Sequence, residues 1–528
     1  MSSTIGDLGL PLAILIGIAT LGYLASRKLS SHDPREPPLA PSAIPIIGHL
    51  IGLSRSKFNY YSALYHQSRS PISTLPIPGQ KMYIVNTPEL VQAVQKQHKI
   101  LAFPPIAVKF TKNVCGSSKE ANEIVAINAN GDDGDHGVSM ATYAGMHAAL
   151  KPGPDLDDMN RDMIQEIATL LDKLQPKDQK PRRISLYSWL RASITTATTR
   201  SVYGPLNPYE DQAVADAFWE FEKGFMAVVI GILPWLFARR PIAARKTVSD
   251  GFLAYFEAGG VHKASVLAKN RYKAMVDNNL QHADISKFEV AESIAIMVNT
   301  APAAFWTLFL VHSHPGLLEE LRVEIDACTR TTPDGKLKTI DITTLKQNCP
   351  LLLSAYQEVL RHRSMGTSVR EVMQDTYLDK YLLKKGAMLQ MPSRVIHQDA
   401  SLWGADYAEF NPRRFLAENK KNRPSDVCFR AFGGGKTLCP GRHFATNEVL
   451  AVVAAFVARL DMRPADGAEW KLPTAENTNV AAVIMEPDAD VQVEITTRKG
   501  FEGVRWAVSL DGSDKIFAMV TEDGVETE

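Results

Sequence analysis

Cysteine is scarce in this sequence, with five cysteines spread over 528 residues and no C-x-x-C pair among them. This pattern argues against a disulfide scaffold and a thiolate zinc site, and it predicts a reducing compartment. Net charge is also absent, because 58 lysines and arginines balance 58 aspartates and glutamates. The chain therefore lacks the positive excess that nucleic-acid-binding proteins use to grip phosphate backbones.

An apolar run without charge occupies residues 8–25. As a helix it would span roughly 27 Å, which matches a thin endoplasmic-reticulum bilayer. Arg27 and Lys28 follow the run, whereas a cleaved signal peptide has its positive charges in front. We therefore predict a single-pass membrane anchor over residues 1–28, with the rest of the chain in the cytosol.

Prolines cluster directly behind this run, at positions 34, 37, 38, 41 and 45. They disfavour helix and predict an extended linker over residues 29–45. No second linker or internal repeat follows. Residues 46–500 are predicted to form one catalytic domain, mainly α with a small β-sheet, and residues 501–528 a C-terminal tail without an assigned role. Helical patterns lie at 158–173, 209–231, 246–277, 288–311, 316–328, 342–361 and 444–460, and strand-like segments at 82–86 and 387–392.

The strongest motif runs from Phe432 to Gly441 and fits F-x-x-G-x-x-x-C-x-G, with Gly435 and Cys439 at the fixed inner positions. Its glycines let backbone amides turn toward one sulfur, where N–H donors stabilise a thiolate and tune a bound metal. The alternative is a buried, inert cysteine. With this motif the sequence resembles the cytochrome P-450 superfamily. The resemblance implies heme b (iron protoporphyrin IX) as cofactor, Cys439 as the metal ligand, and Phe432 and Gly435 as parts of the cofactor-binding loop.

Two further segments resemble the same superfamily. Glu358 and Arg361 form an E-x-x-R pair at i, i+3 on one helix face, and Phe410–Phe415 resembles the F-x-P-x-R-F segment that supplies Arg414. The resemblance implies that Glu358, Arg361 and Arg414 form a structural triad that holds the heme-binding core.

The expected partners of the heme propionates depart from the superfamily pattern. Tyr143 and His147 stand where the superfamily commonly has W-x-x-x-R, and Thr437 stands where it has an arginine before the ligand. Tyr143 and His147 are therefore weaker candidate donors, with ordinary helix-surface residues as the alternative. Arg370 is the better-placed cationic candidate.

The central helix departs as well. Counting back from His314-Pro315 places Asn299 where oxygen-activating families carry threonine, and Val298 where they carry an acid. The string from Asn299 to Trp306 resembles the branch of bile-acid sterol hydroxylases and prostacyclin synthase. Pro302 lacks an N–H, so we expect a kink that frees the carbonyl of Val298. Asn299 and Thr300 are the predicted catalytic residues, the alternative being a helix that merely packs.

Taken together, the resemblance implies a membrane-anchored heme-thiolate monooxygenase. It would hydroxylate a large apolar molecule such as a terpenoid, sterol, alkaloid or other secondary metabolite, using O2 and electrons from NADPH. An NADPH-dependent cytochrome P-450 reductase would be its partner. The alternatives are a heme-thiolate isomerase or dehydratase that needs no reductase, because the same branch contains such enzymes, and a non-catalytic heme sensor.

Overall fold

The computed structural model describes residues 32–511 except 43, 45–46, 78, 177–179, 232 and 480–481. The predicted anchor over residues 1–28 and tail residues 512–528 lie outside the described residues. The chain divides into two compact units. Unit 1 comprises Met1–Phe103 and Thr367–Ile396, and unit 2 comprises Pro104–Gly366 and His397–Glu528.

Unit 1 is built on a five-stranded sheet in the order β1-β2-β10-β7-β3. Its strands are β1 Ile72–Ile77, β2 Gln80–Val85, β3 Leu101–Ala102, β7 Thr367–Val372 and β10 Met388–Pro392. Strand β2 pairs antiparallel with β1 and parallel with β10, so segments far apart in sequence lie side by side. The strand-like segments predicted at 82–86 and 387–392 are β2 and β10.

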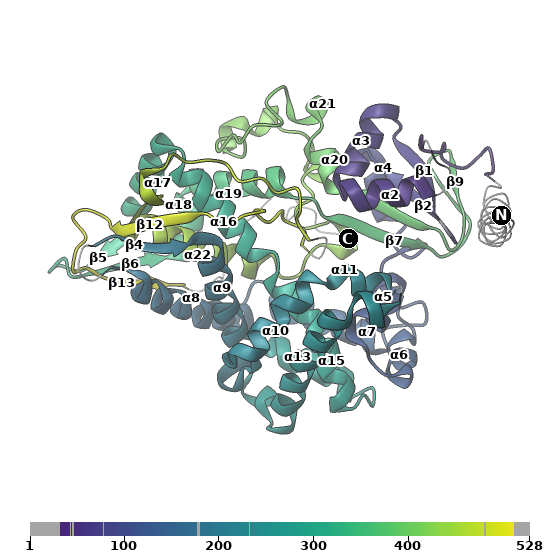
Figure 1. Ribbon diagram of the computed structural model, residues 1–528, viewed down its shortest axis with the longest axis horizontal. Helices are drawn as coiled ribbons and strands as arrows, with labels where there is room; N and C mark the ends of the chain where they lie inside the picture. The colour runs from purple at the N-terminus through teal and green to yellow at the C-terminus, as the bar shows by residue number, and fades with distance from the viewer. Residues whose placement is uncertain are drawn as a thin grey trace, which may run out of the picture. The chain divides into compact units, whose positions relative to one another are not determined.

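Short helices and a hairpin complete unit 1. The helices are α2 Ile47–Ser56, α3 Asn59–Ser68 and α4 Pro88–Lys96, and the hairpin pairs β8 Thr376–Leu378 with β9 Tyr381–Leu383 (Figure 1). Tyr61 and Leu64 of α3 pack on Leu75, Ile84 and Val395 in one apolar cluster. Burial of this cluster fixes α3 on the sheet.

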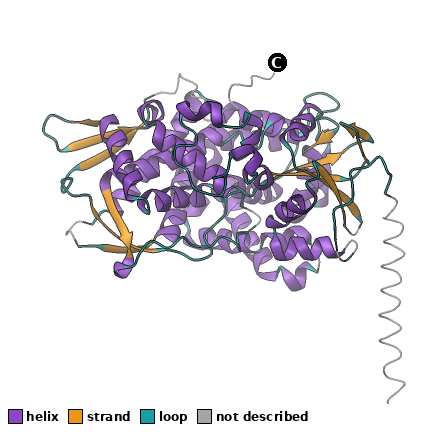
Figure 2. Ribbon diagram, turned by 90° about the horizontal axis from the view of Figure 1, so that it is seen from above, coloured by secondary structure: helices purple, strands orange, loops and turns teal. Residues whose placement is uncertain are grey.

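Unit 2 is mainly helical, and its few short strands lie outside the helices (Figure 2). Each helical pattern predicted from sequence corresponds to one or two of these helices. They are α5 Pro104–Cys115, α6 Lys119–Ala126, α7 Val138–Leu150, α8 Pro154–Leu174, α9 Leu186–Tyr203, α10 Gln212–Lys223, α11 Phe225–Ile230, α12 Pro234–Phe237, α13 Arg239–Glu257, α14 Val266–Val276, α15 His282–Met297, α16 Thr300–His312, α17 Pro315–Cys328, α18 Ile342–Asn348, α19 Pro350–Arg363, α21 Ala400–Trp403 and α22 Arg442–Arg459. Helix α20, Ser393–His397, spans the sequence boundary between the units.

The core of unit 2 contains two helices that are apolar on all sides. Every residue of α16 is buried, and α22 is buried from His443 onward except at Ala445. The stretch His282–His312 is long and apolar enough to cross a membrane, yet most of it is buried inside the protein. Helix α16 packs against α9, α19 and α22. This packing fixes the segment in front of α16, which carries Asn299, and the segment in front of α22, which carries Cys439.

The structure has several small sheets where the sequence predicted one. In unit 2 these are β11-β12-β4 and β13-β6-β5, with β4 Arg182–Ser185, β5 Thr329–Thr331, β6 Leu337–Asp341, β11 Leu460–Pro464, β12 Gln492–Thr497 and β13 Arg505–Ser509. Such short strands from remote segments leave no alternating pattern long enough to detect. Strand β13 lies in the predicted tail and pairs parallel with β6.

Candidate active site

The loop before α22 turns sharply around Cys439. Gly433 and Gly435 have φ of 83° and 58°, conformations that glycine adopts without strain. The loop then folds back, because the backbone N–H of Cys439 donates to the carbonyl of Phe432 over 2.9 Å. Phe432 and Gly435 therefore shape the turn that presents the sulfur, which is the place that the motif predicts for them.

The Cys439 sulfur lies at the N-terminus of α22. Burial raises the pKa of its thiol, while the backbone N–H groups of Gly441 and Arg442 and the charge of Arg442 lower it. Donors and a helix N-terminus favour a thiolate, the form of cysteine that binds metal. The residues present thus fit a thiolate-ligated heme iron.

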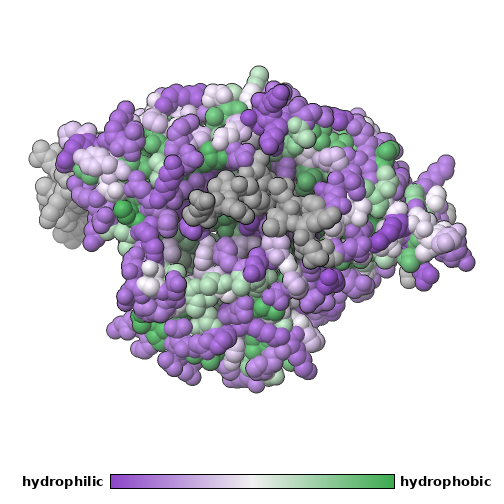
Figure 3. All heavy atoms as spheres, turned by 180° about the vertical axis from the view of Figure 1, so that it is seen from behind, coloured by the Kyte–Doolittle hydropathy of each residue, from purple (hydrophilic) through white to green (hydrophobic). Residues whose placement is uncertain are grey.

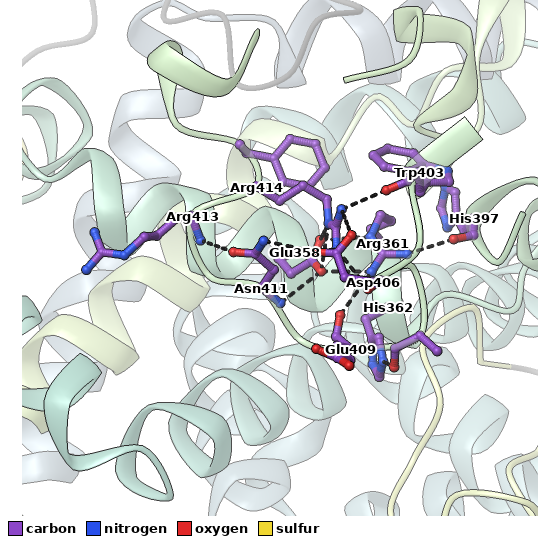
Figure 4. Close-up of polar contacts among 12 residues, drawn as sticks. Glu358, Arg361, His362, His397, Trp403, Asp406, Glu409, Asn411, Arg413 and Arg414 are labelled. Carbon is purple, nitrogen blue, oxygen red and sulfur yellow. Dashed lines mark hydrogen bonds and ion pairs between the residues drawn. The ribbon is translucent and has the colours of Figure 1, made fainter. Parts of the chain in front are cut away.

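The three residues of the predicted triad lie together in unit 2 and are buried. The two oxygens of Glu358 accept hydrogen bonds from Arg361 at 2.7 and 2.8 Å and from Arg414 Nε at 3.1 Å (Figure 4). The backbone N–H of Asn411 also donates to Glu358 at 3.1 Å. Arg361 also donates to the carbonyl of His397 at 2.7 Å, and Arg414 also donates to the carbonyl of Trp403 at 3.0 Å. This saturation offsets the cost of burying three charges.

A histidine connects the triad to the cysteine loop. The carbonyl of His397 accepts from Arg361, and its ring Nε2 accepts from the backbone N–H of Arg430 at 2.7 Å. Arg430 in turn accepts, at its carbonyl, from Gly433 N–H at 3.1 Å. The charged cluster therefore positions the start of the loop that ends in Cys439.

Helix α7 carries both predicted propionate donors of unit 2. The Tyr143 hydroxyl donates to the carbonyl of Lys436 in the cysteine loop, so α7 lies against this loop. The rings of Tyr143 and His147 are 4.3 Å apart. His147 Nε2 is buried and has no hydrogen-bond partner in the part of the chain that the structure describes. A buried ring nitrogen without a partner beside the loop fits a donor that awaits an anionic group.

Arg370 lies on β7 in unit 1. It is buried, its Nη1 donates to the carbonyl of Val369 at 2.7 Å, and its guanidinium is 5.9 Å from the ring of Phe103. Its role toward the propionates stays a prediction.

The central helix is interrupted where the proline pattern predicts it. Helix α15 ends at Met297 and α16 begins at Thr300. Asn299 lies at the interruption, and its Oδ1 accepts the backbone N–H of Val483 at 2.6 Å. The amide oxygen of Asn299 is thus already bonded, whereas its NH2 group has no hydrogen-bond partner among the described residues. This engagement with a distant segment could not be foreseen from the sequence.

Thr300 contacts Glu448, a buried acid that the sequence did not single out. Thr300 is buried, and its hydroxyl interacts with the carboxyl of Glu448 on α22. Glu448 is fully buried, accepts from Thr198 at 2.6 Å, and has its pKa raised to about 8 by burial. The available signal was a single acid inside the apolar run of α22. Thr300 therefore faces a protonatable carboxyl of the core.

This arrangement defines a class of site: one cysteine sulfur at a helix N-terminus, in a loop positioned by a saturated Glu-Arg-Arg cluster, is a heme-thiolate site. The comparisons with known proteins agree. The family model of cytochrome P450 matches residues 262–493. Cytochrome P450 monooxygenase nodJ of Hypoxylon pulicicidum is 33% identical over 522 residues, which cover 96% of this chain and 99% of that protein. The chain belongs to the cytochrome P450 family and is an oxidoreductase of the monooxygenase class.

Two more distant relatives extend this comparison. A cytochrome P450 monooxygenase of Gibberella zeae is 27% identical, over 96% of this chain and 98% of that protein. The 25-hydroxycholesterol 7-alpha-hydroxylase of Rattus norvegicus is 24% identical, over 65% of this chain and 86% of that protein. The predicted likeness to the sterol-hydroxylase branch is confirmed. The family implies a heme iron cofactor.

Proposed function

We propose that this protein is a membrane-anchored heme-thiolate monooxygenase that hydroxylates a large apolar secondary metabolite, such as a terpenoid, sterol or alkaloid. Its cofactor is heme b, and its electrons come from NADPH through a cytochrome P-450 reductase. The single observation that carries the proposal is the sulfur of Cys439 at the N-terminus of α22, beside two backbone N–H groups.

The residues of unit 2 have separate roles in this proposal. Cys439 holds the iron, and His147 on α7 donates to a propionate. The NH2 group of Asn299 orders water or a substrate oxygen, while the Oδ1 of the same side chain holds Val483 in place. When bound, a thiolate-ligated heme iron supplies the activation of dioxygen.

The assignment of the iron ligand is tested by Cys439→Ala. In the reduced wild-type protein, carbon monoxide should produce the long-wavelength Soret band typical of thiolate-ligated heme, and the variant should lack this band. Cys428→Ala is the matched control, because Cys428 is buried nearby in sequence but outside the motif. Persistence of the band in Cys439→Ala would exclude the assignment.

The reaction class is tested by leaving out the redox partner. Purified holoprotein with an extract of candidate metabolites should form products one oxygen heavier only when NADPH and reductase are both present. Product formation without either would instead support an isomerase or dehydratase. The specific observation that favours this second candidate is Val298, an apolar residue where oxygen-activating families carry an acid.

Attachment to the endoplasmic-reticulum membrane is proposed from two features. One is the apolar run at residues 8–25. The other is an apolar surface on α11, α12 and the turn between them, whose large side chains are 47% to 67% exposed: Ile230, Leu233, Trp235, Leu236 and Phe237. Two exposed arginines, Arg239 and Arg240, follow at once, a combination that suits the headgroup region of an anionic bilayer. By contrast, most of the face drawn in Figure 3 is hydrophilic.

Carbonate extraction tests this attachment. The full chain should stay in the membrane pellet, and deletion of residues 1–28 should weaken the attachment without loss of heme. In the shortened protein, Trp235→Ser with Phe237→Ser should release the remaining membrane-bound fraction. Full release of the intact chain by carbonate would contradict the anchor.

A further inference from the structure

Two cysteines of unit 2 meet where helix α17 ends and helix α19 begins. Cys328 is the last residue of α17, and Cys349 directly precedes Pro350, the first residue of α19. Their Sγ atoms are 3.4 Å apart, and both residues are free thiols. Between them the chain passes through β5, β6 and α18 before it returns to the same place. The contact between the two sulfur atoms is therefore created by the fold.

Two hydrogen bonds hold the backbone around this contact in place. Glu324, which lies one turn before Cys328 on α17, accepts from the backbone N–H groups of Leu351 and Leu352 at 3.1 and 3.2 Å. These N–H groups belong to the first turn of α19, where N–H groups have no partner within the helix. The carboxyl of Glu324 therefore ties the start of α19 to the end of α17, and the two sulfur atoms stay within reach of each other.

The two thiols differ in their access to solvent. Cys328 is 9% exposed and Cys349 is 1% exposed, so an oxidant from solution reaches Cys328 first. Burial raises the pKa of Cys349, and the hydrogen bond with Cys328 raises it further, so Cys349 rests as a thiol. A disulfide has an S–S length of about 2.0 Å. Since the sulfur atoms already lie at the separation of reacting atoms, a small side-chain movement is enough to join them.

We propose that Cys328 and Cys349 form a peroxide-responsive site, in which hydrogen peroxide oxidises the two thiols to one reversible disulfide that stabilises the fold. The Cys328 sulfur attacks one peroxide oxygen, the O–O bond breaks, and the leaving hydroxide takes the thiol proton to form water. The product is a sulfenic acid. The Cys349 sulfur then attacks the Cys328 sulfur, the S–O bond breaks, and hydroxide leaves with the Cys349 proton as a second water. The two thiols lose two electrons in total, and the peroxide gains them.

This site lies outside the machinery of the proposed function, but it suits a monooxygenase. Transfer of two electrons to O2 without formation of product yields hydrogen peroxide, so the oxidant arises when turnover fails. Helix α19 carries Glu358 and Arg361 of the triad, and the disulfide adds a covalent tie at the start of this helix. In a reducing compartment, cellular thiols return the pair to its resting state once the peroxide is removed.

Peptide mapping tests the proposal on the intact holoprotein. The protein is exposed to increasing hydrogen peroxide, over the range in which its carbon monoxide band stays intact, and free thiols are then alkylated. Trypsin digestion without reduction places Cys328 in peptide 323–330 and Cys349 in peptide 347–361, each with a single cysteine. The two peptides should appear linked and two hydrogens lighter than their sum, and dithiothreitol should separate them.

Variants assign the two steps to the two sulfurs. Cys349→Ala should form no linked peptide and should stop at the sulfenic acid of Cys328, which dimedone traps. Cys328→Ala should bind far less dimedone, because Cys349 is the more buried thiol. Cys115→Ala is the matched control, since Cys115 is a buried cysteine on α5, and this variant should still form the linked peptide.

Thermal unfolding measures the stabilising effect. The oxidised wild-type protein should have a higher Tm than the reduced protein, because the cross-link restricts the unfolded chain. Cys349→Ala should show no such rise. Three outcomes overturn the proposal: no linked peptide at any peroxide concentration that spares the heme, equal dimedone labelling in the wild-type protein and Cys349→Ala, or a linked peptide without a rise of Tm.

Discussion

Two regions of unit 2, the triad and the partly accessible face of α15 formed by Glu292, Ala295 and Ile296, each carry a glutamate, and the two carboxyls differ in burial and in hydrogen bonding. Glu358 receives five hydrogen bonds from two arginines and one backbone N–H, and it is completely inaccessible. Glu292 on α15 has none among the described residues. The carboxyl of Glu358 is satisfied within the fold, whereas the side chain of Glu292 is partly accessible to solvent.

The difference separates residues that hold the fold from residues that act on ligands. A saturated charge cluster resists change, because removal of one member strands the others. An unsatisfied group is tolerated where a ligand or cofactor completes it. His147 beside the cysteine loop belongs to the second kind. Asn299 lies between the two, since its oxygen is bonded and its NH2 group has no partner among the described residues.

The largest effect is expected at the saturated cluster. Glu358→Ala leaves Arg361 buried without a carboxylate and leaves Arg414 with Asp406 alone, which should cost about 3–5 kcal/mol of unfolding free energy. The measurable result is little heme-loaded protein after expression.

The pair of exposed Glu319 and buried Arg322, 3.1 Å apart, is the control, because Arg322 also pairs with Asp461. Glu319→Ala should cost about 1 kcal/mol or less. Normal heme loading in Glu358→Ala would remove the basis for calling the triad structural.

Substitution of Asn299 should lower the turnover of the enzyme without loss of heme. Asn299→Ala removes the group that we propose to act at the reacting centre, so turnover should fall by a factor on the order of ten to a thousand while the carbon monoxide spectrum stays normal. NADPH consumption without product is the other readout of the same defect. Asn299→Asp keeps an acceptor for the Val483 N–H but loses the NH2 group. Full activity in this variant would show that Asn299 acts only by holding Val483.

His147 should affect heme retention more than its neighbour Tyr143 does. His147→Leu removes the ring nitrogen that is free to donate, and the lost charge-assisted hydrogen bond should speed heme transfer to apomyoglobin about tenfold. Tyr143→Phe should have a smaller effect, because that hydroxyl is already used on Lys436. Equal transfer rates in His147→Leu and the wild-type protein would place His147 among ordinary helix residues.

The smallest effect is a pH dependence of stability that originates at Glu448. Its pKa is raised from 4.5 to about 8 by burial, so the folded protein holds a proton that the unfolded chain has released. The free energy of unfolding contributed by this group is therefore complete below about pH 4.5 and is lost as the pH rises through about 8. Glu448→Gln should flatten this decline, seen as a smaller drop of Tm between pH 5 and pH 8. Glu120→Gln on the surface should leave the drop unchanged, and an equally steep drop in Glu448→Gln would show that Glu448 is ionised in the fold.

The sequence predicts those parts of the site that have a fixed local spacing. Three features depend on neighbours within a few residues, and their patterns can therefore be recognised in the sequence. They are the cysteine loop, the pair of Glu358 and Arg361, and the helix break before Pro302. Contacts between remote segments leave no such pattern. The bond from Val483 to Asn299, the approach of Thr300 to Glu448 and the lone carboxyl of Glu292 emerge only when the helices pack. The same holds for strands as short as β3 and β5, whose partners lie elsewhere in the chain.

The bond between His397 and the backbone of Arg430 has a consequence for how this enzyme can evolve. The start of the cysteine loop is positioned by a main-chain group and a histidine ring. Side chains on the accessible face of α15 take no part in that support. Substitutions at Glu292, Ala295 or Ile296 can therefore occur without disturbing the metal ligand. A lineage of such enzymes can accumulate substitutions on one helix face while the loop that carries the cysteine is inherited unchanged.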